Sequence, residues 1–136
     1  SMANDLPTDV KLHKKSGTLE LVYSDELGNE LSAEFLRVHS PSAEVRGHGR
    51  GQEVLQIGKR RVKILSLETV GNYAIKLAFD DGHDSGIYSW TYLKELCRGK
   101  ENLWQRYLKK LMKAGASRDS LPADTQVLSF KPSPSK

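Results

Sequence analysis

The first two thirds of the chain alternate apolar and polar residues with the period of β-strands. Residues 10–12, and residues 19–23 after Gly17, carry an apolar side chain at every second position. The same pattern returns in residues 62–67 and 73–79, which are separated by the dipeptide Gly71-Asn72. Alternation with period two is typical of half-buried strands, and Gly-Asn suits a tight turn. These segments therefore predict antiparallel hairpins, with Tyr73, Ile75, Leu77 and Phe79 on a buried face.

Two segments between the hairpins are harder to interpret. Residues 31–35 would continue a third strand, whereas residues 32–38 would equally form a short helix, because Ala33 and Leu36 would share a face. Residues 39–53 contain three glycines and one proline and few apolar residues. They predict a long loop, and loops of that length within a domain are often functional.

The hydrophobic period changes at Ser89, which is a suitable helix N-cap. Apolar residues then recur with helical spacing until the Arg98-Gly99-Lys100 segment, which predicts a break. Asn102, with Gln105 three residues later, predicts the start of a second helix that ends at Gly115. One apolar face of this helix is predicted to contain Leu103, Trp104, Tyr107, Leu108, Leu111 and Met112.

These elements predict an α+β fold, in which an antiparallel β-sheet is followed by one or two C-terminal helices packed on the sheet. Residues 8–118 are expected to form one domain. Residues 1–7 are expected to be disordered, with Ser1 before Met2 resembling a tag scar. The Pro- and Ser-rich residues 119–136 are expected to form a disordered tail.

Composition narrows the function classes. The single cysteine, Cys97, excludes an internal disulfide and a four-cysteine metal site within the chain. No apolar run approaches the roughly 20 residues of a membrane span, and no secretion signal is recognisable, so a cytoplasmic location is expected. Residues 1–88 have a net charge of −2, whereas residues 89–118 carry eight Lys or Arg against two Glu. The positive charge therefore lies on one late segment of the chain rather than being spread over the fold.

Three phrases of the sequence, residues 36–44, 70–75 and 79–90, carry a family resemblance. The most specific is Asp-Gly-His-Asp-Ser-Gly-Ile-Tyr-Ser-Trp at residues 81–90. Together they resemble stand-alone bacterial members of the family named for the N-terminal domain of gamma-butyrobetaine hydroxylase, a domain of unknown function. The resemblance covers about residues 8–115. Such domains also occur joined to iron–sulfur scaffold ATPases, which implies an accessory part in metal or iron–sulfur cofactor handling.

The hydroxylase domain that this sequence resembles holds a structural zinc, and its ligands are three cysteines and one histidine. Those positions correspond here to Ser40, Ser42, Val45 and His83, so only the histidine is retained. Hydroxyls and a valine are poor zinc ligands compared with thiolate and imidazole. We therefore expect no cofactor at this site.

His83 remains the most chemically distinctive residue, because it follows Asp81 and Gly82 in an acidic turn. One hypothesis is a metal site in which His83 acts with the loop residues His39 and His48, a ligand set suited to iron or zinc. The alternative is a histidine that packs or forms hydrogen bonds near Ser40 and Ser42 as a remnant of the zinc site.

Basic residues supply a second set of candidates. Arg46 and Arg50 lie in the loop, where no phosphate-binding motif follows them. Four further basic residues fall on the polar face of the second helix: Arg106, Lys109, Lys110 and Lys113. These six residues are predicted to contact a partner. Binding of nucleic acid through the helix is an alternative, although no aromatic side chains alternate with these cations to stack bases.

The sequence thus predicts a non-catalytic interaction or accessory module with an unidentified protein partner. Neither a nucleic acid nor a membrane is expected as its main partner, and the sequence specifies no oligomeric state. It is not expected to be an enzyme, since it contains no recognisable nucleophile signature and no His-x-Asp/Glu pair of the kind that oxygenases use. A metal-binding protein that uses His83 is the first alternative, and a weak nucleic-acid binder is the second.

Overall fold

The computed structural model describes residues 5–24, 28–47, 51–121, 126, 128 and 130, and within them the strands form two antiparallel sheets of three strands each. The first sheet contains β1 (Asp9–His13), β2 (Thr18–Val22) and β3 (Asn29–Ser32), in that order. The second contains β4 (Ile64–Val70), β5 (Ala74–Phe79) and β6 (Gly86–Ser89). The predicted α+β class and antiparallel pairing are confirmed. The strands divide between two sheets because residues 33–63 run through helices and irregular segments before β4 begins.

The segment around residues 31–38, for which the sequence allowed a strand or a helix, forms first a strand and then a helix. The strand ends at Ser32, whose Oγ accepts a hydrogen bond from the Phe35 N–H and so caps α2 (Ala33–Val38). A hydroxyl at the N-cap satisfies one of the N–H groups that lack a partner in the first turn of a helix. The expected 39–53 loop contains a further short helix, α3 (Ala43–Arg46), which is capped in the same way by Ser42.

The two C-terminal helices are α4 (Trp90–Arg98) and α5 (Lys100–Ala114). Ser89 caps α4 as predicted, because its Oγ accepts the Tyr92 N–H at 3.0 Å. The predicted start of the second helix at Asn102 is wrong by two residues. The Gly99 carbonyl already accepts the Leu103 N–H, which closes the first turn without a side-chain cap. Gly115 ends α5 in the left-handed conformation that glycine adopts without steric cost.

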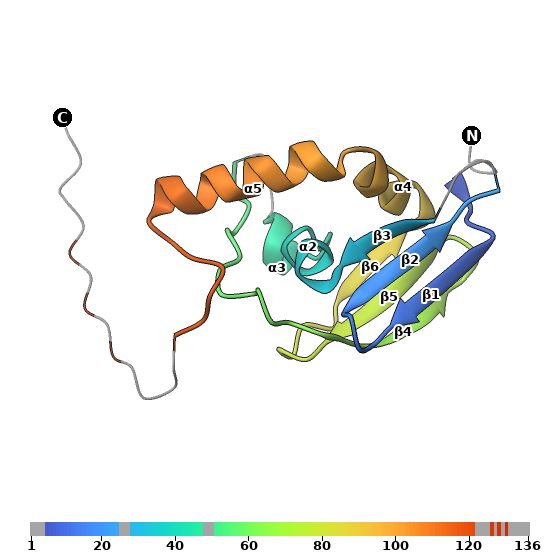
Figure 1. Cartoon of the computed structure of the whole chain (residues 1–136), viewed down its shortest axis with the longest axis horizontal. Helices are drawn as coiled ribbons and strands as arrows, with labels where there is room; N and C mark the ends of the chain where they lie inside the picture. Colours follow the sequence, from blue (N-terminus) through green and yellow to red (C-terminus); the bar gives the residue numbers. More distant parts are fainter. Residues whose placement is uncertain are drawn as a thin grey trace.

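The core lies between the two sheets and is closed by α2 and α4. Figure 1 shows the sheets stacked at one side of the molecule, with α5 extending away from them over α2 and α3. The main buried cluster draws on both sheets and includes Leu19, Leu21, Leu31, Ile75, Leu77, Phe79, Tyr88, Leu93 and Leu96. A smaller cluster joins the far half of α5 to α2 through Val38, Tyr107 and Leu111. None of the helices in the described part of the chain is long and apolar enough to cross a membrane.

Two residues predicted to be buried are exposed. Tyr73 is 52% exposed because it lies in the turn before β5 rather than in the strand. Met112 is 81% exposed because the apolar face of α5 is narrower than the pattern predicts, and only Tyr107 and Leu111 are buried there.

Leu77 and Leu65 provide a matched test of the core assignment. Leu77 is fully buried, whereas Leu65 on the neighbouring strand is 55% exposed. We expect Leu77→Ala to lower the free energy of unfolding by about 2–5 kcal/mol, because it leaves a cavity between the sheets. Leu65→Ala should change it by less than about 1 kcal/mol. Urea unfolding followed by circular dichroism measures both, and equal losses would contradict the assignment.

Candidate functional site

His83 lies in the turn between β5 and β6 and is directed into the protein. Its residue exposure is 5%, and its ring packs against Phe79 with 6.1 Å between ring centroids. The chain can fold this way because the turn closes on itself: the Phe79 N–H donates to the His83 carbonyl, and the His83 N–H donates to Asp81 Oδ1. Gly82, with φ of +89°, supplies the left-handed conformation that this turn requires.

The two ring nitrogens of His83 contact Ser40, between α2 and α3, and Glu44, within α3. Nε2 lies 2.8 Å from Ser40 Oγ, and Nδ1 lies 3.2 Å from a carboxylate oxygen of Glu44. Since a carboxylate only accepts, Nδ1 carries the hydrogen, and in the neutral ring Nε2 accepts from the Ser40 hydroxyl. Ser40 is fully buried, and a Cβ on Gly86 would lie 2.7 Å from its Oγ, so only glycine fits at that point.

Asp81 forms an ionic link beside this histidine. Its Oδ2 accepts from Arg37 Nε at 2.8 Å and from Lys59 Nζ at 2.5 Å. Burial would raise the pKa of Asp81, but the hydrogen bonds from Lys59, the His83 amide and Arg37 outweigh it and lower the pKa to about 2. Burial also lowers the pKa of His83, and the nearby Arg37 lowers it further, while Glu44 and Asp81 act in the opposite direction.

The side chains at the family's zinc positions do not fit a zinc ion. Ser40 Oγ is bonded to His83, and Ser42 Oγ lies 2.8 Å from Ser85 Oγ. Val45 is a buried aliphatic residue that offers no donor atom. Zinc in proteins is held by thiolates, imidazoles and carboxylates, and hydroxyls are not among its ordinary ligands. The site is therefore held together by hydrogen bonds in this chain.

The other predicted histidines are not brought to His83 by any contact that the structure describes. His39 Nδ1 lies 2.8 Å from the Phe35 carbonyl, and its ring packs against Phe35 and Tyr107. His48 lies outside the described residues, as does Arg50. The metal site of His83 with His39 and His48 thus stays a prediction.

A groove of about 560 Å³ lies between α3, residues 51–56 and α5, and we call it the α3–α5 groove. Three of the predicted partner-contacting residues, Arg46, Arg106 and Lys110, line it from two different helices. Lys109 and Lys113 are exposed on α5 but do not line the groove. Its walls also include His39, Val54, Leu55, Tyr92, Leu103 and Tyr107.

Hydrogen bonds fix the walls of the α3–α5 groove. Tyr92 donates to the His39 carbonyl at 2.5 Å and accepts from Arg46 at 3.3 Å, while Tyr107 donates to the Gln56 carbonyl at 2.6 Å. Burial lowers the pKa of His39, the Phe35 carbonyl opposes this, and the positive charges of Lys110 and Arg46 lower the pKa further. Cations from α3 and α5 therefore act on the same imidazole.

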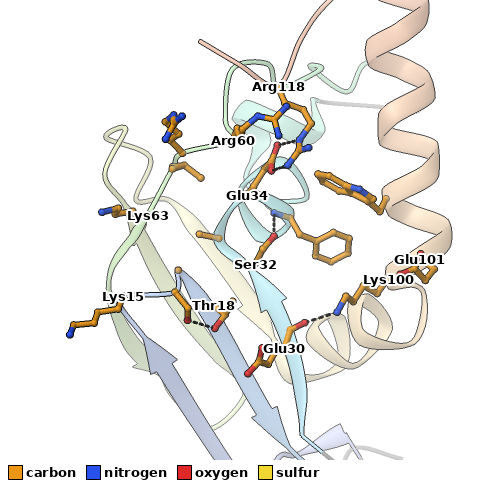
Figure 2. A pocket seen from close by; sticks show the side chains of 17 residues that line it. Lys15, Thr18, Glu30, Ser32, Glu34, Arg60, Lys63, Lys100, Glu101 and Arg118 are labelled. Carbon is orange, nitrogen blue, oxygen red and sulfur yellow. Dashed lines mark hydrogen bonds and ion pairs between the residues drawn. The ribbon is translucent and has the colours of Figure 1, made fainter.

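A second cavity of about 630 Å³, which we call the basic pocket, lies on another side of α5. Figure 2 shows Lys15 and Lys63 at one side of it, Arg60, Glu34 and Arg118 at another, and Lys100 near Glu30. None of the residues that line this pocket is among the site residues predicted from the sequence. The basic run Lys59-Arg60-Arg61-Val62-Lys63 is the signal that could have found part of it.

One further cluster lies on the surface of the first sheet. The ligand atoms of His13, Glu20 and Glu30 lie within 4.8 Å of one another, and His13 Nε2 is 2.9 Å from Glu20. The three side chains come from three consecutive strands, with His13 and Glu30 exposed and Glu20 half-buried, and exposed acidic groups are common in proteins without a metal. No sequence spacing marks this group, because strand register alone brings it together.

The buried histidines predict a loss of stability at acid pH. Because the folded state lowers the pKa of His83 and His39 below 6.5, the unfolded chain binds more protons near that pH. Their contribution is full above about pH 6.5 and is lost as the pH falls below it. We expect the free energy of unfolding to drop between about pH 7.5 and pH 5.5, with a smaller drop in His83→Gln. Urea unfolding at both pH values tests this, and an unchanged pH dependence in the variant would refute the role of His83.

The side chains at Ser40, Ser42, Val45 and His83 predict how much metal the purified protein holds. We expect the protein purified without chelators to hold no stoichiometric zinc or iron, because one imidazole and two engaged hydroxyls bind these ions weakly. Elemental analysis of the wild type and of His83→Ala measures this directly. A stoichiometric metal that the variant loses would overturn the expectation and support the metal-binding hypothesis.

Comparison with known proteins places the chain in a family. Residues 10–94 match the family model described as gamma-butyrobetaine hydroxylase-like, N-terminal. No curated protein matches the chain.

Solved structures agree with this match. An NMR solution structure is 51% identical, with a TM-score of 0.75, and the match covers 90% of this chain and 98% of that one. A second NMR structure is 46% identical, with a TM-score of 0.70, and 92% of each chain is covered. A crystal structure from Acidithiobacillus ferrooxidans, of a protein of unknown function in the DUF971 family, is 31% identical with a TM-score of 0.57. It covers 68% of this chain and 93% of its own. This chain therefore belongs to the gamma-butyrobetaine hydroxylase-like N-terminal domain family.

Proposed function

We propose that this chain is a non-catalytic interaction module that binds an acidic segment of a partner protein in the α3–α5 groove. The observation that carries the proposal is the convergence of Arg46, Arg106 and Lys110 on one cavity. Positive side chains around a concave, partly apolar site favour a segment that combines carboxylates with an aliphatic or aromatic residue.

The lining of the α3–α5 groove supports an acidic occupant. Glu53 is the one acidic residue among the residues that line it, against three Lys or Arg. Val54 is 54% exposed beside these cations and offers apolar surface for the same segment. Apolar contact and charge complementarity together are typical of a protein interface, in which the charges mainly set specificity and association rate.

A non-catalytic role is supported by the surroundings of an arrangement of described residues that resembles catalytic machinery. Ser40, His83 and Glu44 follow the order of nucleophile, base and acid in a hydrolase triad. Ser40 is fully buried, however, and neither the α3–α5 groove nor the basic pocket is lined by Ser40 or His83. A nucleophile must reach a substrate, so we interpret this chain of hydrogen bonds as structural.

Nucleic acid is the less favoured occupant. Binding of single strands usually combines cations with exposed aromatic rings. Tyr107 is buried, and Trp104 is half-buried with Arg118 over its ring at 5.0 Å. The accessory role in metal or iron–sulfur cofactor handling that the resemblance implies makes proteins of that kind the first partners to test.

The groove residues can be tested against a matched pair on the same helix. Arg106→Gln/Lys110→Gln removes two charges inside the groove, and Lys109→Gln/Lys113→Gln removes two charges outside it. With an acidic peptide of Asp, Glu, Leu and Phe as the probe, we expect binding to weaken at least about tenfold in the first variant and by less than about threefold in the second. Calorimetry measures both affinities. NMR of His39 provides an independent readout, since a bound carboxylate should raise its pKa.

Affinity capture from the native host extends the test to real partners. The expected proteins are retained by the wild type and by the Lys109/Lys113 variant, are lost with the Arg106/Lys110 variant, and persist after nuclease treatment. Equal effects of the two variants would contradict a specific groove. Capture that nuclease abolishes would favour nucleic-acid binding instead.

A further inference from the structure

We infer that the basic pocket is a second binding site, which takes a small phosphate-bearing molecule. This site is separate from the α3–α5 groove, because its residues on α5, Lys100, Glu101 and Trp104, differ from those that line the groove. The inference therefore does not depend on the proposed protein partner.

Positive charge converges on the basic pocket from four separate parts of the chain. Six of its seventeen lining residues are Lys or Arg and three are Glu. The cations come from the β1–β2 turn, the segment before β4, the first turn of α5 and the residues that follow α5. They are Lys15, Arg60, Arg61, Lys63, Lys100 and Arg118. No local sequence feature requires these four segments to meet, so the pocket is a product of the tertiary fold.

Two of these cations, Arg118 and Arg60, form ion pairs that stabilise the wall of the pocket. Arg118 donates two hydrogen bonds to Glu34, at 2.8 and 2.6 Å, and lies over the Trp104 ring. Arg60 pairs with Asp119, and its backbone N–H donates to the Arg118 carbonyl. These contacts bind residues 117–119 to residues 58–60 and fix one wall. Bidentate arginine pairs of this kind are rigid and directional.

The remaining charge is available to a ligand. Lys15, Arg61 and Lys63 are exposed, and the structure gives their side chains no hydrogen bond or ion pair to any residue that it describes. Like charges gathered at one concave site repel each other, and a bound anion removes that repulsion. Lysine and arginine are the ordinary protein ligands of phosphate, through charge and N–H donors respectively.

The size and walls of the basic pocket favour a small molecule. A volume of about 630 Å³ falls within the roughly 300–1,000 Å³ range of small-ligand sites. Phe35 and Trp104 add apolar side chains to the lining, next to Arg118, which lies over the Trp104 ring. An organic group attached to the phosphate would therefore have an apolar wall to contact. Figure 2 shows the labelled side chains around this space.

Titration with inorganic pyrophosphate and with ADP tests the inference. The wild type, Arg61→Gln/Lys63→Gln and the charge-matched control Lys109→Gln/Lys113→Gln are compared by calorimetry and by amide NMR. We expect saturable binding to the wild type that weakens at least about tenfold in the Arg61/Lys63 variant and by less than about threefold in the control. Shifted resonances should include Lys15, Lys63 and Trp104. Thermal unfolding confirms that the variants are folded, which is expected because the substituted side chains are exposed.

The two probes also separate the sources of affinity. Tighter binding of ADP would support contact between the organic group and the apolar wall, and equal binding would support recognition of the phosphate alone. The inference is overturned if neither probe saturates by about 10 mM, if both variants weaken binding equally, or if sodium chloride at matched ionic strength reproduces the shifts. Resonance changes confined to the α3–α5 groove would also overturn it.

Discussion

A set of hydrogen bonds between residues 36–44 and residues 81–88 holds α2 and α3 in place against the β5–β6 hairpin. Ser40 and Glu44 bond to His83, Ser42 to Ser85, and the Tyr88 hydroxyl donates to the Leu36 carbonyl at 2.5 Å. Because α2 and α3 lie outside both sheets, these bonds help to join them to the β5–β6 hairpin, together with the packing of Phe35 and Leu36 in the core. The positions of Arg46 and His39, and hence one wall of the α3–α5 groove, depend on them.

This junction lies at the positions that correspond to the zinc ligands of the hydroxylase, but here hydrogen bonds join its residues. In the hydroxylase that the sequence resembles, the corresponding positions bind zinc, whose bonds contribute folding free energy directly. Here each hydrogen bond contributes about 1 kcal/mol on balance, and the partly buried ion pair of Arg37 with Asp81 lies beside them. Stability at this junction is therefore spread over many weak contacts, and His83 links it to pH.

Two positively charged surfaces lie on different sides of α5, and the residues around the charges differ between them. On one side, Arg106 and Lys110 lie with apolar residues in the α3–α5 groove. On another, Lys100 and Trp104 contribute to the basic pocket, whose wall is fixed by the pair of Arg118 and Glu34. One helix thus connects a surface suited to a peptide with a pocket suited to a small anion, and variants on each side can test them separately.

The sequence by itself determined the local structure: the strands, the Ser89 cap, the two C-terminal helices and the α+β class all follow from periodicity and capping, which depend on near neighbours. It also identified His83 and all three groove cations by residue type. Only the tertiary structure decided that the strands form two sheets, that Met112 is exposed, and that His83 binds Ser40 and Glu44. It alone brought Lys15 to Arg61 and Lys63, since contacts between distant segments depend on how the elements pack, and no local pattern encodes that packing.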